Sequence, residues 1–284
     1  MKTLDSQNSI TILIERIRSK QKEIHRWLTS YEGANELPLY SSVDIRNAGF
    51  KAAVVDTNIF PSGFNNLCEH GLKDSEALIR AAIQKRVENC KNILIIAEEH
   101  TRNTWYLENI RILQEIISKA GFNAKIATFL NVQPVFCEKA NHVELETATG
   151  ESVRIYCFKK IAEEYESGRE PIDLLIMNND LTTGIPEPLR NSKIPIYPSI
   201  QAGWHSRLKS YHFNHTQDLL KEFEQILDVD AWLFSCLHNV IENVDINVEA
   251  DRIKLQDQVS DLFQSIQRKY REHHINEKPY IFIK

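Results

Sequence analysis

Apolar residues recur with helical spacing in some segments of the chain and form short unbroken runs in others. Helical spacing covers residues 9–32, 74–89, 104–120 and 204–271, the last with breaks near 228–230 and 245. Short apolar runs of strand length lie at residues 40–45, 50–55, 92–97, 123–129 and 172–177. Because helices and strands alternate between residues 74 and 177, the pattern predicts an α/β fold: a mostly parallel sheet with flanking helices, followed by a largely helical C-terminal region.

Three further segments modify this scheme. Residues 142–146 and 152–158 bracket a Thr-Gly-Glu turn and predict a hairpin that is inserted into the fold as a flap. Four prolines between residues 186 and 198 predict an extended, non-helical segment. The final run, residues 279–284, is rich in aromatic and β-branched side chains and predicts a strand.

No internal repeat or flexible linker marks a domain border. A chain of 284 residues is long enough for one large or two ordinary domains. We place a soft border near residue 200, with an α/β substrate-binding domain at residues 1–200 and a helical region at residues 201–284.

The charge balance and the cysteines argue against a nucleic-acid-binding protein, a membrane protein and a disulfide-stabilised protein. The 34 basic and 39 acidic side chains give a net charge of -5, so no general positive field attracts nucleic acid or a membrane surface. No apolar run approaches the roughly 20 residues that span a bilayer, and the charged N-terminus has no signal-peptide core, so we expect a cytoplasmic protein. The five cysteines are odd in number and lack a C-x-x-C pair, which predicts reduced thiols without a mutual bridge.

Polar side chains cluster in four places that follow apolar runs or open helices, where open α/β sheets gather their ligands. The first cluster lies within residues 44–66 and contains Arg46, Asn47, Asn58, Asn65 and Asn66. The arginine offers a planar fork for a carboxylate or phosphate, and the asparagines offer donors and acceptors for an amino-acid-like ligand. Ordinary turn chemistry is the alternative explanation, because Asn and Gly are common in turns.

The second cluster, residues 98–103, connects a predicted strand to a predicted helix. Backbone N–H groups at the start of a helix favour an anion, and Arg102 would strengthen that preference. The alternative is that Thr101 or Asn103 caps the helix, while Glu98 and Glu99 are solvated.

The third cluster is the triplet Asn178, Asn179 and Asp180, which ends a predicted strand. Two amides and a carboxylate suit an ammonium group or a metal-bound water. Helix or turn capping is the alternative role.

The fourth cluster lies at residues 202–213, where basic side chains alternate with aromatic ones. On a helix, His205, Lys209 and His212 would share one face, with Arg207 off it, and such a face could hold phosphate. A solvated basic helix is the alternative, and nucleic acid is disfavoured by the negative net charge.

Several familiar catalytic motifs are absent from the sequence. It contains no P-loop, dinucleotide-binding, zincin or serine-hydrolase signature. Cys68 precedes His70 by two positions, so a cysteine nucleophile of the amidotransferase kind is a further hypothesis.

Five blocks of residues closely resemble a bacterial family of glutamate-cysteine ligases. The blocks are residues 44–51 (DIRNAGFK), 56–67 (DTNIFPSGFNNL), 99–103 (EHTRN), 178–181 (NNDL) and 203–207 (GWHSR). The resemblance implies ATP-dependent joining of the γ-carboxylate of L-glutamate to the amino group of L-cysteine, the first step of glutathione synthesis, with ATP and Mg²⁺. It implies no membrane or nucleic-acid partner.

The resemblance also implies roles for individual residues. Roles in catalysis would fall to Arg102, His205 and Arg207, and contacts with ATP to Lys209 and Lys284; no metal ligand is implied. Substrate binding would fall to Arg46, Asn47, Asn58, Asn65, Asn66, Asn103, Asn178, Asn179 and Asp180. We further expect Arg46, Arg102, Asn178 and His205 to converge on one cleft.

Such ligases resemble ATP-grasp enzymes, in which the strand that matches residues 279–284 continues into a glycine-rich, acidic segment with much of the nucleotide and metal site. The sequence ends at Lys284, so the expectation is the N-terminal portion of a truncated ligase, inactive alone but able to bind glutamate weakly. A non-catalytic amino-acid-binding or interaction remnant of the same fold is the alternative.

Overall fold

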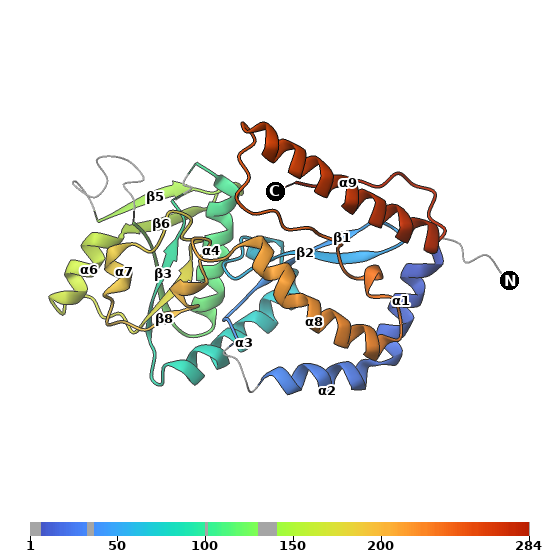
Figure 1. Cartoon of the computed structure of the whole chain (residues 1–284). Helices are drawn as coiled ribbons and strands as arrows, with labels where there is room; N and C mark the ends of the chain where they lie inside the picture. The colour runs from blue at the N-terminus through green and yellow to red at the C-terminus, as the bar shows by residue number, and fades with distance from the viewer. Residues whose placement is uncertain (1–6, 33–36, 100–101, 130–140, 284) are drawn as a thin grey trace. The chain divides into compact units, whose positions relative to one another are not determined.

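The computed structural model describes residues 7–32, 37–99, 102–129 and 141–283 (Figure 1). The chain forms two compact units. The sheet unit comprises residues 37–42 and 58–207, and the helical unit comprises residues 1–36, 43–57 and 208–284.

The sheet unit is built on six strands. They are β3 (Asn92–Ala97), β4 (Asn123–Thr128), β5 (His142–Glu146), β6 (Ser152–Cys157), β7 (Leu174–Asn178) and β8 (Ile196–Tyr197). The order across the sheet is β5-β6-β4-β3-β7-β8, and every neighbouring pair is parallel except β5 and β6. The mostly parallel α/β sheet that the sequence predicts is therefore confirmed.

Alternate residues of the central strands face two apolar layers, because successive side chains of a strand point to opposite faces. On one face, Ile93 and Ile95 pack with residues of α3 (Glu69–Arg86) and α4 (Thr104–Lys119). On the other face, Leu94 and Ile96 pack with residues of α6 (Phe158–Glu166) and α7 (Glu187–Arg190). Burial on both faces explains why the strand sequences are continuously apolar.

Some boundaries in the sheet unit differ from the prediction. The hairpin at 142–157 exists, but it is the edge of the main sheet and not a flap, because β6 pairs in parallel with β4. The proline-rich segment is not wholly extended: α7 begins after Pro186, with a proline in its first turn, where a missing N–H costs no hydrogen bond. Helix α3 begins at Glu69 rather than near residue 74, because the Sγ of Cys68 caps it by accepting from the Gly71 N–H.

The helical unit contains four helices and a two-stranded sheet among its described residues. The helices are α1 (Gln7–Ser19), α2 (Gln21–Glu32), α8 (Lys209–Leu227) and α9 (Glu249–Glu272), and β1 (Ser42–Asn47) pairs with β2 (Ala52–Asn58). Short 3-10 turns lie at η1 (Phe64–Asn66), η2 (Ile200–Ala202) and η3 (Ala231–Leu233), the first two in the sheet unit.

The core of the helical unit joins distant parts of the sequence. Leu13, Phe50, Leu227 and Trp232 are buried in one cluster, and the rings of Phe50 and Trp232 stack at 6.0 Å. The units therefore do not follow a linear border at residue 200: residues 1–36 and 43–57 belong with residues 208–284. The roles assigned to residues 1–200 and 201–284 stay predictions.

In the helical unit, β2 is a half-exposed strand, with Ala53 its one buried residue, because only one strand pairs with it. Two expectations for residues 201–284 are wrong. His205 lies in a turn before α8 begins at Lys209, so it shares no helix face with Lys209 and His212. Residues 279–283 form no strand, since no described strand pairs with them, and the side chain of Phe282 is 88% exposed; Lys284 lies outside the described residues.

The cysteines also differ from expectation. Cys68, Cys90 and Cys236 are free thiols, whereas Cys157 is disulfide-bonded. The expectation of unbridged thiols is therefore wrong for Cys157, because distance along the sequence does not reveal closeness in space. Among the helices of the described ranges, none has the length and apolar character needed to cross a membrane.

Candidate functional site

A polar pocket of about 510 Å³ lies at the carboxyl end of the central strands in the sheet unit. Its described lining consists of Ser62, Asn65, Asn66, Glu98, Asn103, Trp105, Tyr106, Asp180 and Thr182. These residues follow β3 and β7, open α4, or belong to the loop around η1. Parallel α/β sheets place ligands in this position, where several loops meet at one edge.

Two buried asparagines tie the loops around the pocket together. Asn178, at the end of β7, donates its side-chain amide to the carbonyl of Pro61 at 2.9 Å. Asn179 donates to the carbonyl of Ala97 at 3.0 Å, and its Oδ1 accepts from the Leu181 N–H at 2.9 Å. Since both side chains are buried and hydrogen-bonded, they position the pocket wall and do not line it.

Tyr106 connects the end of β7, at Asn178, to Glu98 in the pocket wall. Its hydroxyl accepts from the Glu98 N–H at 2.7 Å and donates to the carbonyl of Asn178 at 3.1 Å. Burial raises the pKa of Tyr106 well above its usual value, so the phenol stays protonated and keeps the donor. The Glu98 carboxylate in turn accepts from the Asp180 N–H, which brings two acidic residues together at the pocket.

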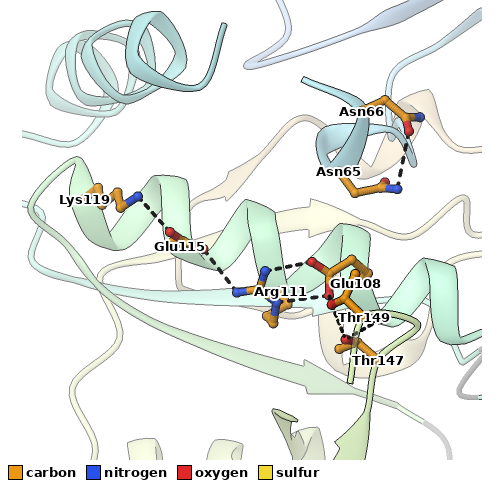
Figure 2. A network of polar contacts seen from close by, with 8 residues as sticks. All are labelled: Asn65, Asn66, Glu108, Arg111, Glu115, Lys119, Thr147 and Thr149. Carbon is orange, nitrogen blue, oxygen red and sulfur yellow. Dashed lines mark hydrogen bonds and ion pairs between the residues drawn. The ribbon is translucent and has the colours of Figure 1, made fainter. Parts of the chain in front are cut away.

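The helix that carries the pocket residues Trp105 and Tyr106 is held by charged side chains (Figure 2). Arg111 forms a fork on Glu108 at 2.7 and 3.1 Å and also contacts Glu115, which pairs with Lys119. The Thr149 hydroxyl, in the turn after β5, donates to Glu108 at 2.9 Å. Hydrogen bonding from Arg111 is the main cause that lowers the pKa of Glu108 to about 2, so this buried carboxylate stays ionised.

Four of the predicted site residues line the pocket: Asn65, Asn66, Asn103 and Asp180. Asn103 also caps α4, because its Oδ1 accepts from the Tyr106 N–H at 3.2 Å. The helix-cap alternative and the binding hypothesis are therefore compatible at this residue. Asn65 and Asn66 lie beside each other in η1, with Nδ2 and Oδ1 3.5 Å apart.

Other predicted residues of the sheet unit lie outside the pocket lining. The Oδ1 of Asn58 accepts from the Phe60 N–H at 2.9 Å, which is ordinary turn chemistry. Arg102 is exposed just before α4, and the Arg207 guanidinium lies 5.3 Å from the ring centroid of Trp204. His205 is exposed beside Gly203. Their predicted roles stay untested, as does the shared cleft.

The remaining predicted residues belong to the helical unit or lie outside the described residues. Arg46 and Asn47 are exposed on β1, and Asn47 accepts from the Gly49 N–H at 2.8 Å in the predicted turn. Lys209 forms an ion pair with Asp56. Lys284 is not among the described residues.

The donor groups of the pocket do not match ATP or Mg²⁺. The described lining holds no Lys, Arg or His to meet phosphates, and no group of three metal-ligating side chains occurs among the described residues of the chain. The described side chains of the pocket therefore provide neither a phosphate-binding nor a metal-binding set.

The prediction missed five of the lining residues: Ser62, Glu98, Trp105, Tyr106 and Thr182. Glu98 directly follows β3, and a position at the end of a central strand indicates a site residue, but the sequence analysis considered Glu98 only as a solvated side chain. Trp105 and Tyr106 look like ordinary helix residues in sequence. Only the packing of α4 shows that one is buried and the other exposed at the pocket.

Comparison with known proteins places this fold in a family. The family model described as glutamate-cysteine ligase (GshA) matches residues 15–284. A crystal structure from Methylobacillus flagellatus KT, named "putative gamma-glutamylcysteine synthetase", is similar with a TM-score of 0.83 and 30% sequence identity. The match covers 96% of this chain and 63% of that one, so the chain spans less than two thirds of the similar protein. A search of curated protein sequences found no match. With a family match over nearly its whole length and a structural match in the same fold, the chain belongs to the glutamate-cysteine ligase family.

Proposed function

We propose that this protein takes part in ATP-dependent formation of γ-glutamylcysteine from L-glutamate and L-cysteine, the first step of glutathione synthesis. The observation that carries the proposal is the family match over residues 15–284. The reaction would use ATP and Mg²⁺, and we propose the cytoplasm as its compartment. The amino-acid substrates would bind in the pocket that Asn65, Asn66 and Asp180 help to line.

The pocket supports the amino-acid part of this proposal by its chemistry. Amides supply donors and acceptors, and carboxylates accept from an ammonium group, which together match the polar groups of an amino acid. Its volume of about 510 Å³ lies in the range of small-molecule sites. A reaction of this kind depends mainly on positioning, because an amine attacks an activated carboxylate only when the two are held in contact.

An assay of the purified chain tests the proposal directly. The chain is incubated with ATP, Mg²⁺, glutamate and cysteine, and γ-glutamylcysteine is detected by mass spectrometry alongside ADP release. Product that requires both amino acids supports the ligase. Omission of either amino acid serves as the control.

The described pocket lining holds amides and carboxylates but no Lys, Arg or His to meet phosphates, and this favours a second candidate, an amino-acid-binding protein without ligase activity. Isothermal titration separates the two. Binding of an amino acid without binding of ATP and without product would favour the second candidate, and binding of neither amino acid would overturn both.

A further inference from the structure

Trp105 differs from the other residues of the pocket because its side chain is both large and exposed. It is 61% exposed, whereas the other three tryptophans of the chain are buried or half-buried. Tryptophan is on average a well-buried residue, since its indole carries a large apolar surface. Apart from Trp105 and the buried Tyr106, the described lining consists of amides, hydroxyls and carboxylates. Trp105 therefore supplies the one large apolar surface that the described lining offers to a ligand.

The backbone that carries Trp105 is held from both sides. Asn103 caps α4 by accepting from the Tyr106 N–H at 3.2 Å, and the Thr104 carbonyl accepts from the Ala148 N–H at 3.1 Å. Successive side chains of a helix are about 100° apart around its axis, so Tyr106 is buried while Trp105 is exposed at the pocket. The indole is therefore presented to the pocket from a fixed base.

We propose that Trp105 is a specificity-determining residue, which packs against the aliphatic stem of the amino-acid substrate and selects glutamate over the shorter aspartate; this proposal rests on the proposed function. The amides and hydroxyls of the lining can bind the polar groups of an amino acid. The methylene groups between those polar groups gain nothing from such partners. They gain free energy when an apolar surface covers them and removes them from water.

The length of the stem decides how much of it the indole covers. Glutamate has two methylene groups between its α-carbon and its terminal carboxylate, and aspartate has one. Burial of one further methylene group corresponds to roughly a 4-fold gain in affinity. Because the two amino acids carry the same polar groups, the difference between their affinities isolates the apolar contact.

Titration calorimetry of the chain tests this contact. L-Glutamate and L-aspartate are titrated into the wild-type chain, Trp105→Phe and Trp105→Ala. We expect the wild-type chain to bind glutamate about 4-fold more tightly than aspartate, and Trp105→Phe to keep most of this preference because it keeps an aromatic ring. In Trp105→Ala the preference should fall below about 2-fold, and glutamate binding should weaken roughly 10-fold.

Intrinsic fluorescence provides a second readout, which a merely structural role would not change. A ligand that covers Trp105 removes water from its indole, so glutamate should shift the tryptophan emission of the wild-type chain to shorter wavelength. Trp105→Phe keeps the other three tryptophans, and it should lose the shift while it still binds glutamate.

Leu78→Ala is the matched control, because Leu78 is an apolar residue of the sheet unit that is 69% exposed and lies outside the described lining. Circular dichroism checks that each variant is folded. The proposal is overturned if Trp105→Ala keeps the wild-type preference for glutamate, if it weakens cysteine binding alone, or if Leu78→Ala has the same effect.

The product assay distinguishes this failure from failure of the proposed function. Product formation with an unchanged KM for glutamate in Trp105→Ala would overturn the role of Trp105 and leave the ligase standing. A preference for glutamate that depends on Trp105, without product from the wild-type chain, would support the role of Trp105 and contradict the ligase. Absence of amino-acid binding to the wild-type chain would overturn both.

Discussion

The side-chain amide of Asn178 donates to the carbonyl oxygen of Pro61 at 2.9 Å, joining the end of β7 to the loop that carries Asn65 and Asn66. The two residues are 117 positions apart. Through this bond, a buried residue that does not line the pocket controls the position of residues that do.

Replacing Asn178 should therefore affect both stability and binding. Asn178→Ala leaves the Pro61 carbonyl without its side-chain donor, and we expect a loss of about 1–3 kcal/mol in the free energy of unfolding. Denaturant unfolding measures this loss, and amino-acid binding should weaken with it. The exposed Asn191→Ala should stay within about 0.5 kcal/mol of wild type. Equal stability of both variants would show that the bond contributes nothing.

Glu108 should make the fold sensitive to acid. The pKa of Glu108 in the folded chain is about 2, below the ordinary value of about 4.3. At any pH above about 4.3 the ionised carboxylate therefore stabilises the fold, and this contribution is lost as the pH falls toward 2. We expect Glu108→Gln to cost about 2 kcal/mol at pH 7 and about half as much at pH 3. Unfolding is measured at both pH values, with the exposed Glu163→Gln as control. A cost independent of pH would contradict the role of the ionised carboxylate.

Lys51 should make the free energy of unfolding depend on pH in the alkaline range. Its Nζ donates to the Ser235 carbonyl at 2.5 Å and lies 4.3 Å from the ring centroid of Trp232, and burial lowers its pKa to about 8. Between pH 8 and the ordinary value of about 10.4 the unfolded chain holds the proton more tightly, so the free energy of unfolding should rise with pH.

Lys51→Met should lack this rise, and nuclear magnetic resonance of the lysine side chains should show one titration midpoint near pH 8 that disappears in the variant. The exposed Lys22→Met serves as the control within the helical unit. An unchanged set of midpoints in Lys51→Met would reject the assignment.

Gly203 should resist substitution for a steric reason. A Cβ at this position would lie 2.7 Å from His205 Nδ1 and 2.9 Å from the Cβ of Leu181, closer than van der Waals contact allows. We expect Gly203→Ala to destabilise the chain by about 1–3 kcal/mol, measured by thermal or denaturant unfolding. Gly71→Ala in α3, where a Cβ would meet atoms at 3.6 Å or more, should be neutral or slightly stabilising.

The free cysteines should react in a defined order. Cys68 is exposed, whereas burial raises the pKa of Cys90 to about 11 and also raises the pKa of Cys236, so little thiolate is present in either. Iodoacetamide followed by peptide mapping should label Cys68 first. The same labelled protein tests the amidotransferase hypothesis, since product formation that survives alkylation of Cys68 would exclude that residue as a nucleophile.

The alternation of apolar runs was sufficient to predict the parallel sheet. Residues 92–97 and Asn123–Thr128 are strands within one residue of the predicted bounds, and α4 ends at Lys119, one residue before the predicted end. The local sequence is enough to predict these elements. A strand that is buried on both faces has a continuous run of apolar residues, and a helix that is buried on one face has apolar residues at helical spacing.

Tertiary structure alone decided the grouping of the chain and the composition of the pocket. The helical unit joins Leu13, Phe50 and Trp232, whose separations in sequence reveal nothing of their contact. The sequence predicted roles for Asn65, Asn66, Asn103 and Asp180, which line the pocket, but not for Glu98 or Trp105, which line it as well. Asn178, for which it also predicted a role, is buried and is not among the described lining residues. Amides and carboxylates cap turns and bind ligands with the same chemistry, so only their burial and partners separate the two roles.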